Sequence, residues 1–311
     1  MERFFVKKME ILKPNHKAGY VAIVGEPNVG KSTLLNALLK QKISIVTNKP
    51  QTTRQRVLGI LSIDDAQIVF LDTPGLLQPK YLLQKEMMKS VESALGEADI
   101  VLFMTQTSRG TELPIELSEH VLPLCKIKPV ILLINKVDTI NKADILPVIE
   151  SFDKLNYFKE IIPISALQKD NIDAIVQSLI QYLPEHEAFY PADIVSESPE
   201  RFFVAELIRE QLFKKFSEEI PYSTAVEIRE FKERETGKTL IRADIIVERD
   251  SQKGIIIGKN GEALKSIGTS ARIQIEEFLQ RAVFLELHVK VREKWRESEA
   301  MLRQLGYSSK K

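Results

Sequence analysis

The chain of 311 residues has a single cysteine, Cys125, which excludes an internal disulfide and fits a reducing compartment. Its four histidines are scattered along the sequence, so they do not predict a metal-binding cluster. No apolar run approaches the roughly 20 residues that span a bilayer, and residues 1–17 lack the pattern of a signal peptide. We therefore expect a soluble, cytoplasmic protein without an obligate oligomer.

An excess of either charge is also missing, because 44 Lys and Arg residues nearly balance 43 Asp and Glu residues. Any contact with nucleic acid must then come from local clusters of charge rather than from the overall field of the protein. With 28% charged and 44% hydrophobic residues, the composition is that of an ordinary globular protein. At roughly 150 residues per domain, the length predicts two domains.

Short β-branched runs alternate with helical patterns between residues 20 and 182, which is typical of an α/β domain with a mostly parallel sheet. The runs expected as strands are residues 20–24, 68–71, 100–104, 130–134 and 161–163. Three prolines then interrupt the pattern, and a smaller α+β domain follows. The expected divisions are an N-terminal extension at 1–17, the first domain at 18–183, a linker at 184–199, and the second domain with a C-terminal helix at 200–311.

A glycine-rich segment follows the first expected strand and precedes a helix-forming run. This order predicts a phosphate-binding loop, in which backbone N–H groups surround the phosphates. Lys31 supplies a charge to the β- and γ-phosphates, and the Ser32 hydroxyl is the expected ligand of Mg²⁺. The residues predicted to bind the nucleotide here are Gly25, Glu26, Pro27, Asn28, Val29, Gly30, Lys31, Ser32 and Thr33.

A second part of the predicted site is the turn after the second expected strand, formed by Asp72, Thr73, Pro74 and Gly75. The Asp72 carboxylate can reach Mg²⁺ through water, and the Gly75 N–H can contact the γ-phosphate. Between the two segments lies a polar loop in which Thr53 can complete the Mg²⁺ shell. The predicted catalytic residues are Lys31, Thr53, Asp72 and Gly75.

Guanine recognition is predicted for the loops after the last two expected strands. Guanine presents two N–H donors that the Asp138 carboxylate can accept, whereas adenine would leave that charge unpaired. We expect Asn135 to tie this loop to the phosphate loop, the Lys136 stem to lie against the base, and the Ala166 N–H to contact guanine O6. The residues predicted for this part of the site are Asn135, Lys136, Asp138, Ser165 and Ala166.

These five elements, in this order, resemble the signature of translation-factor-type GTPases, which implies GTP and GDP as ligands and Mg²⁺ as cofactor. The position after Gly75 holds Leu76, where Ras-like enzymes carry the glutamine that orients the attacking water. The sequence resembles the GTPase branch with an apolar residue there. Within that branch, an asparagine placed as Asn28 is associated with a K⁺ ion that substitutes for an arginine finger, so K⁺ is a further implied cation.

The second domain contains another glycine-bearing loop, followed by a helical pattern. Gly258-Lys259-Asn260-Gly261 resembles the G-x-x-G loop of KH domains, in which the backbone closely approaches a single RNA strand. We expect the apolar residues 255–257 to form the floor of the RNA groove, in a region with more basic than acidic side chains. The predicted RNA-binding residues are Ile257, Gly258, Lys259, Asn260, Gly261, Lys253, Lys265 and Arg272.

A GTPase domain joined to a type II KH domain, with Pro50-Gln-Thr-Thr-Arg54 in its first mobile loop, resembles the Era family of bacterial GTPases over residues 20–295. The resemblance implies binding of 16S rRNA near its 3′ end, a role in biogenesis of the 30S ribosomal subunit, and peripheral association with the inner membrane face. GTP is expected to order the loop of Thr53 and the turn of Gly75, and hydrolysis is expected to release them and change the availability of the RNA domain.

Two rival interpretations use the same motifs differently. In the first, the protein is a signalling GTPase whose C-terminal domain docks protein partners. The second, an RNA-modifying enzyme, is disfavoured because no nucleophile–base pair or metal cluster is found outside the nucleotide motifs. Residues 290–303 are expected to form an end helix on the KH core rather than a helix in a membrane interface.

Overall fold

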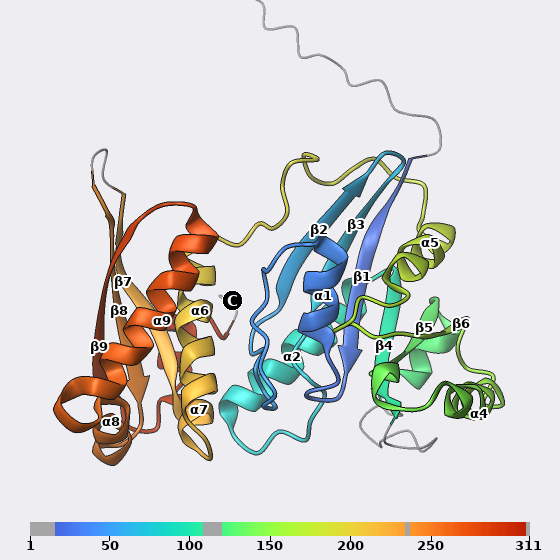
Figure 1. Ribbon diagram of the computed structural model, residues 1–311. Coiled ribbons are helices and arrows are strands. Elements are labelled where there is room, and N and C mark those ends of the chain that lie inside the picture. The colour runs from blue at the N-terminus through green and yellow to red at the C-terminus, as the bar shows by residue number, and fades with distance from the viewer. Residues whose placement is uncertain (1–15, 108–119, 234–236, 309–311) are drawn as a thin grey trace, which may run out of the picture.

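The computed structural model describes residues 16–107, 120–233 and 237–308, which form two domains side by side (Figure 1). Nearly all of the expected extension at residues 1–17 lies outside this described part, so its role stays a prediction. Within the described residues, no helix is long and apolar enough to cross a lipid bilayer.

The first domain is built on a six-stranded sheet in the order β2-β3-β1-β4-β5-β6. Its strands are β1 (Lys17–Gly25), β2 (Val57–Ile63), β3 (Ala66–Asp72), β4 (Ile100–Gln106), β5 (Val130–Asn135) and β6 (Glu160–Pro163). Neighbouring strands are parallel except β2 and β3, which form an antiparallel pair. All five strands expected from the sequence are present. Strand β2 was not predicted; it lies at the edge of the sheet, and Gly59 and Ser62 interrupt its apolar run.

Helices cover both faces of this sheet. They are α1 (Lys31–Leu39), α2 (Leu82–Glu97), α4 (Lys142–Asp153) and α5 (Ile172–Tyr182), with short 3₁₀ turns η2 (Leu122–Lys126) and η3 (Val137–Thr139) between them. Leu34 of α1 and Ile175 of α5 belong to one buried cluster, whereas Val91 of α2 and Phe152 of α4 belong to another. The fold is therefore the predicted α/β arrangement, and the carboxyl ends of its parallel strands form the edge where ligands bind in such sheets.

The second domain has the element order α-β-β-α-α-β. Its main elements are α6 (Glu200–Lys215), β7 (Ala225–Lys232), β8 (Thr239–Val247), α8 (Asp250–Ile257), α9 (Glu262–Leu279) and β9 (Val283–Val291), with the short α7 (Ile220–Ser223) and η4 (Lys259–Gly261). Strand β8 pairs antiparallel with β7 and parallel with β9. Ile208 of α6 and Ile275 of α9 share a buried cluster with Val283 and Val289 of β9. This arrangement confirms the predicted KH fold.

A buried glutamine holds the chain that connects the domains. Helix α5 ends at Tyr182, and α6 begins at Glu200. The Gln67 side chain accepts hydrogen bonds from the N–H groups of Phe189 and Tyr190 at 2.7 and 2.9 Å, and it donates to the Tyr190 carbonyl at 2.8 Å. Because one amide satisfies three backbone groups of the linker, the linker is fixed against β3.

The C-terminal segment lies between the two domains (Figure 1). Its elements are η5 (Trp295–Glu297) and α10 (Glu299–Gln304). Trp295 and Leu302 are fully buried in an apolar cluster that includes Leu83 and Met87 of α2. The end helix expected over residues 290–303 is only partly correct, because residues 290–291 belong to β9 and the helix begins at Glu299. The segment contacts the first domain as well as the KH core, since α2 presents an apolar face to it.

Candidate functional site

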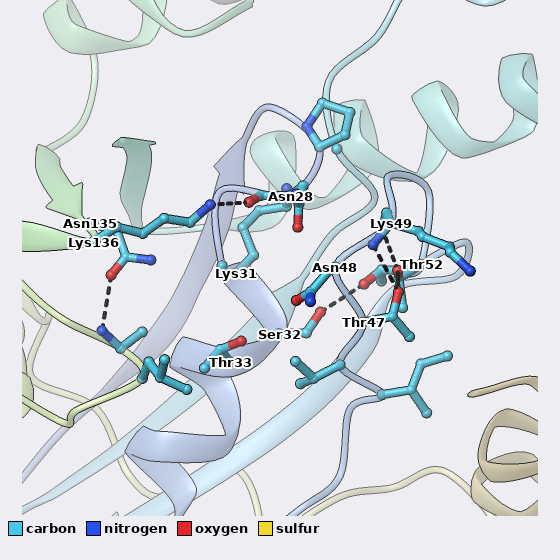
Figure 2. Close-up of a pocket in the computed structure, with 18 of the residues that line it drawn as sticks. Asn28, Lys31, Ser32, Thr33, Thr47, Asn48, Lys49, Thr52, Asn135 and Lys136 are labelled. Atoms are coloured by element: carbon cyan, nitrogen blue, oxygen red, sulfur yellow. Dashed lines mark hydrogen bonds between the residues drawn. The ribbon is translucent and has the colours of Figure 1, made fainter. Parts of the chain in front are cut away.

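A pocket of about 370 Å³ opens at the carboxyl ends of the parallel strands of the first domain (Figure 2). Small-molecule sites have volumes of about 300–1,000 Å³. The lining residues that the sequence predicts are Pro27, Asn28, Gly30, Lys31, Ser32, Thr33, Thr53, Gly75, Asn135, Lys136, Asp138 and Ala166. Residues from five separate segments of the chain therefore meet around one cavity.

Other lining residues were missed by the sequence interpretation. They are Ile45, Val46, Thr47, Asn48, Lys49, Gln51, Thr52, Thr139 and Leu167. Most of them belong to residues 45–53, which we call the Thr53 loop. This segment has no regular pattern, so only its position before Thr53 in the sequence pointed to the pocket.

Some predicted nucleotide residues lie behind the pocket wall rather than in it. Those that do not line the cavity are Gly25, Glu26, Val29, Asp72, Thr73, Pro74 and Ser165. The Thr73 hydroxyl donates to the Ile23 carbonyl at 2.8 Å, and the Ser165 hydroxyl accepts from the Gln168 N–H at 3.1 Å. These side chains shape the loops that carry the lining residues.

The phosphate loop requires glycine at Gly30, which adopts a φ of +106°. A Cβ atom there would lie only 2.4 Å from Nδ2 of Asn135. The helix α1 begins at the next residue, Lys31, so its first turn borders the pocket. A helix N-terminus supplies unpaired N–H groups and a partial positive charge, which together favour an anionic ligand.

Lys31 is a buried cation whose ammonium group is held by backbone carbonyls. Its Nζ donates to the carbonyls of Gly25 at 3.1 Å and Glu26 at 2.7 Å. Burial lowers the pKa of Lys31 to about 8, although the nearby carboxylates of Asp72 and Glu26 act in the opposite direction. Bound phosphates would compensate the loss of hydration of the ammonium group, so Lys31 is suited to bind an anion.

Three oxygen-bearing side chains converge beside Lys31. The Ser32 hydroxyl lies 2.8 Å from Oγ1 of Thr53 and donates to Oδ2 of Asp72 at 2.8 Å. The buried Oδ1 of Asp72 has no hydrogen-bond partner among the described residues. Burial raises the pKa of Asp72, against the opposing effect of Lys31. A set made only of oxygen atoms, with one buried lone acceptor, fits Mg²⁺.

The turn after β3 closely approaches the phosphate loop. A Cβ atom at Gly75 would lie 2.6 Å from the backbone nitrogen of Pro27, so only glycine fits. The next residue, Leu76, is buried in the apolar cluster of α2 and donates its N–H to the Gly25 carbonyl at 3.0 Å. The Leu76 side chain therefore points away from the pocket and cannot orient water.

The loops expected to read the base border the same cavity. Lys136 spans the pocket wall, and its Nζ donates to the Asn28 carbonyl at 3.0 Å (Figure 2). The same Nζ donates to Gln106 Oε1 at 2.8 Å. Asp138 is exposed at the rim. The Ala166 N–H, expected to contact guanine O6, donates instead to Asn135 Oδ1 at 2.9 Å. In the structure this donor is already used within the protein.

The second domain has its own groove of about 390 Å³, between α9 and β9. Its lining residues are Gly261, Leu264, Lys265, Gly268, Thr269, Arg272, Leu285 and Leu287. Of the predicted RNA-binding residues, Gly261, Lys265 and Arg272 line it, whereas the others lie outside it. Residues 255–257, expected to form the floor of an RNA groove, do not line this one, because they belong to helix α8 and Ile256 is buried in the core.

Fold and site together define a P-loop GTPase joined to a KH domain. The family described as "50S ribosome-binding GTPase" matches residues 20–136, and the family described as "KH domain" matches residues 219–296. The chain is 48% identical to "GTPase Era" of Geobacter metallireducens over 295 residues, which cover 94% of this chain and 98% of that protein. It is 45% identical to "GTPase ERA1, chloroplastic" of Zea mays, covering 94% of this chain and 71% of that protein.

Two solved structures match over 94% of this chain and 100% of theirs, each at 44% identity. One is a tyrosine-to-alanine variant of Aquifex aeolicus Era bound to GDP.AlF4⁻, with a TM-score of 0.90. The other is Era in complex with MgGDPNP and nucleotides 1506–1542 of 16S ribosomal RNA, with a TM-score of 0.91. The chain belongs to the Era family, and it is an enzyme that hydrolyses GTP.

Proposed function

We propose that this GTPase binds Mg-GTP in the pocket of its first domain and 16S rRNA near its 3′ end in the groove of its second domain, and that it assists assembly of the 30S subunit. One observation carries the proposal. A nucleotide pocket and a basic KH groove occur in one chain that is 44% identical, over 94% of its length, to an Era structure with MgGDPNP and a 16S rRNA segment.

In the proposed nucleotide complex, Ser32 and Thr53 are Mg²⁺ ligands, and Asp72 holds the ion through water. When bound, Mg²⁺ neutralises charge on the β- and γ-phosphates. Lys31 contacts the same phosphates, and the Gly75 N–H faces the γ-phosphate. Ser32, Thr53 and Asp72 are already joined by hydrogen bonds through the Ser32 hydroxyl, which reduces the reorganisation needed for hydrolysis.

The specificity for guanine is assigned to Asp138. Its carboxylate lies at the rim of the pocket, where it can accept both N–H groups of the guanine edge. The stem of Lys136 lies beside it, and the exposed Leu167 borders the same opening. An adenine in this place would meet the carboxylate with an acceptor, so ATP is rejected.

Asn28 is the proposed K⁺ ligand. It lines the pocket close to Lys31 in a left-handed conformation with a φ of 66°, and its side chain offers an amide oxygen. K⁺ bound there would add the positive charge that other GTPases receive from an arginine finger. The test compares hydrolysis in potassium and sodium salts. We expect faster hydrolysis in potassium, and Asn28→Ala should remove the difference, whereas equal rates for the parent protein would contradict the assignment.

RNA binding is assigned to the groove between α9 and β9. Two cations, Lys265 and Arg272, border a floor of leucine side chains, so phosphates and unstacked bases both find suitable surfaces. The Gly258–Gly261 turn lies at one end of this groove, with positive φ angles of 73° and 78° at its two glycines. These conformations let the backbone come close to a nucleic-acid strand.

A double variant, Lys265→Gln with Arg272→Gln, tests the groove directly. Binding of an oligonucleotide with the sequence of the 16S 3′ end is expected to weaken about tenfold. The slope of the logarithm of affinity against the logarithm of salt concentration should become less steep by up to about two. The matched control is Lys232→Gln, an exposed cation on β7. Unchanged RNA binding by the double variant would contradict the proposal. Small-subunit binding that persists after nuclease removal of rRNA would favour the protein-docking alternative.

A further inference from the structure

The Thr53 loop lies between the nucleotide pocket and α6 of the second domain. Most of its residues line the pocket on one side. On the other side, the Val46 N–H donates to Oε1 of Glu210 at 3.2 Å, and Lys49 donates to two carbonyls at the end of α6. A single helix of the RNA domain therefore supports this loop at several points.

Arg209 of α6 makes the contact next to Thr53. Its Nη2 donates to the Thr52 carbonyl and to Glu206, and its Nε donates to Glu206 at 2.7 Å. The Arg209 side chain is 1% exposed, and its guanidinium carbon lies 5.3 Å from the centre of the Phe213 ring. Burial acts to lower the pKa of Arg209, but Glu206, together with Tyr307 and Glu210, holds the pKa above its usual value. The charged group is thus fixed in place, and so is the carbonyl that it binds.

The residue on the other side of Thr53 is anchored as well. Arg54 donates to the carbonyls of Thr224 at 2.6 Å and Pro221 at 2.8 Å, at the end of α7. Its side chain is 3% exposed. Because both neighbours of Thr53 are bound to the second domain, the Thr53 side chain is presented to the pocket, where Oγ1 lies 2.8 Å from the Ser32 hydroxyl.

We propose that Arg209 is a positioning residue for GTP hydrolysis. By holding the Thr52 carbonyl, the RNA domain keeps the Thr53 hydroxyl at the magnesium position beside Ser32. Arg209 does not line the pocket, so it acts through the peptide that joins Thr52 to Thr53. The inference rests on the proposed role of Thr53 as a Mg²⁺ ligand. It implies that the first domain is fully active only while α6 is docked on the Thr53 loop.

The test measures single-turnover GTP hydrolysis by the full-length protein over a range of Mg²⁺ concentrations. Arg209→Met is expected to slow hydrolysis about tenfold and to raise the Mg²⁺ concentration for half-maximal rate, the scale expected from losing one charged hydrogen bond. Affinity for Mg-GDP should change less than about twofold, because the threonine ligand acts only when the γ-phosphate is present. Arg209→Lys keeps the charge and one donor, so it should recover part of the rate.

These readouts separate positioning from a purely structural role, which would lower stability without a selective change in the triphosphate state. The matched control is Arg242→Met, an arginine of the same domain whose carboxylate partners are Glu230 and Glu286 of the second sheet. Because these ion pairs are exposed, its hydrolysis rate should stay within about twofold of the parent rate.

Thr53→Ala separates the inference from the assignment on which it rests. If Thr53→Ala hydrolyses GTP like the parent protein, the magnesium assignment fails, and the role of Arg209 fails with it. If Thr53→Ala is impaired but folded Arg209→Met is not, only the Arg209 inference is overturned. Should Arg209→Met fail to fold, Glu206→Gln decides, because it leaves the guanidinium without its carboxylate partner. An unchanged Mg²⁺ dependence in that variant also overturns the inference.

Discussion

The Asn135 side chain joins the two halves of the nucleotide pocket: its Nδ2 donates to the Val29 carbonyl at 2.7 Å, across 106 positions of sequence. Its Oδ1 accepts the Ala166 N–H at 2.9 Å, and both hydrogen bonds are buried. One amide thus ties the phosphate loop to the end of β5 and to the turn after β6. Phosphate binding and base recognition are linked through this side chain.

Asn135→Ala is therefore expected to weaken both GTP and GDP binding. The change leaves a buried carbonyl and a buried N–H without partners, at a cost of about 1–3 kcal/mol, or roughly tenfold or more in affinity. Titration calorimetry with each nucleotide measures the effect. Asn141→Ala, at an exposed asparagine bonded to Asp144, serves as the control and should bind normally. Loss of GTP binding alone would argue against the linking role.

Nucleotide affinity should depend on pH through Lys31. In the free protein the pKa of Lys31 is about 8, and bound phosphates raise it because they stabilise the ammonium. The bound state then takes up a proton, so affinity is expected to fall as pH rises above about 8, by up to about tenfold per pH unit. Calorimetry in buffers of different ionisation enthalpy measures this uptake. Affinity that stays constant from neutral pH into this range would contradict the assignment of the phosphate contact.

Gly75→Ala should slow GTP hydrolysis without weakening the binding of GDP. The added methyl group would lie 2.6 Å from the backbone nitrogen of Pro27, so the turn must move away from the phosphate loop. We expect hydrolysis to fall by at least about tenfold while GDP affinity is retained, because only the γ-phosphate needs this turn. At Gly96 a Cβ atom meets nothing within 4 Å, so Gly96→Ala is a matched substitution and should be active. Comparable activity of the two variants would refute the close approach.

The interface between the domains should depend on Arg54. Its guanidinium is buried among backbone carbonyls, and burial lowers its pKa. Arg54→Met removes these charged donors and leaves the Pro221 carbonyl with only the Thr224 hydroxyl at 3.1 Å, so the free energy of unfolding should fall by about 1.5–3 kcal/mol in urea titrations. Two residues further on, Arg56 pairs with Glu97 at the surface. Arg56→Met should therefore cost less than about 1 kcal/mol, and a loss equal to that of Arg54→Met would contradict the account.

The elements that the sequence predicted are those whose signal is local. Gly30 and Lys31 stand in a short motif between a strand and a helix, and the strands at the centre of the sheet are apolar on both faces. Strand β2 and helix α8 were missed because a glycine interrupts or borders the apolar run of each, Gly59 in β2 and Gly254 in α8. A short local pattern therefore locates the phosphate loop, because its residues are consecutive in the sequence. The same kind of pattern misses an edge strand whose apolar run is interrupted.

The contacts of α6 with the Thr53 loop could not be predicted from the sequence. Arg209, Glu210 and Gln211 form a polar run that reads as an exposed helix face, yet all three are buried. Most of their polar groups find partners, several of which belong to the other domain, although Nη1 of Arg209 has no hydrogen-bond partner among the described residues. Contacts between side chains of α6 and the first domain depend on how two surfaces that are distant in sequence meet. The hydrophobic periodicity of a single segment carries no information about them.

The central claim is that a carboxylate at the rim of this pocket reads guanine, and Asp138→Asn tests it most directly. Titration calorimetry with Mg²⁺ should show GTP binding to the parent protein, with ATP weaker by about three orders of magnitude or more. The variant should lose GTP affinity by about a hundredfold and gain affinity for xanthosine triphosphate, whose carbonyl at position 2 matches the new amide. Undiminished GTP affinity in Asp138→Asn, or equal affinities of the parent protein for GTP and ATP, would contradict the claim.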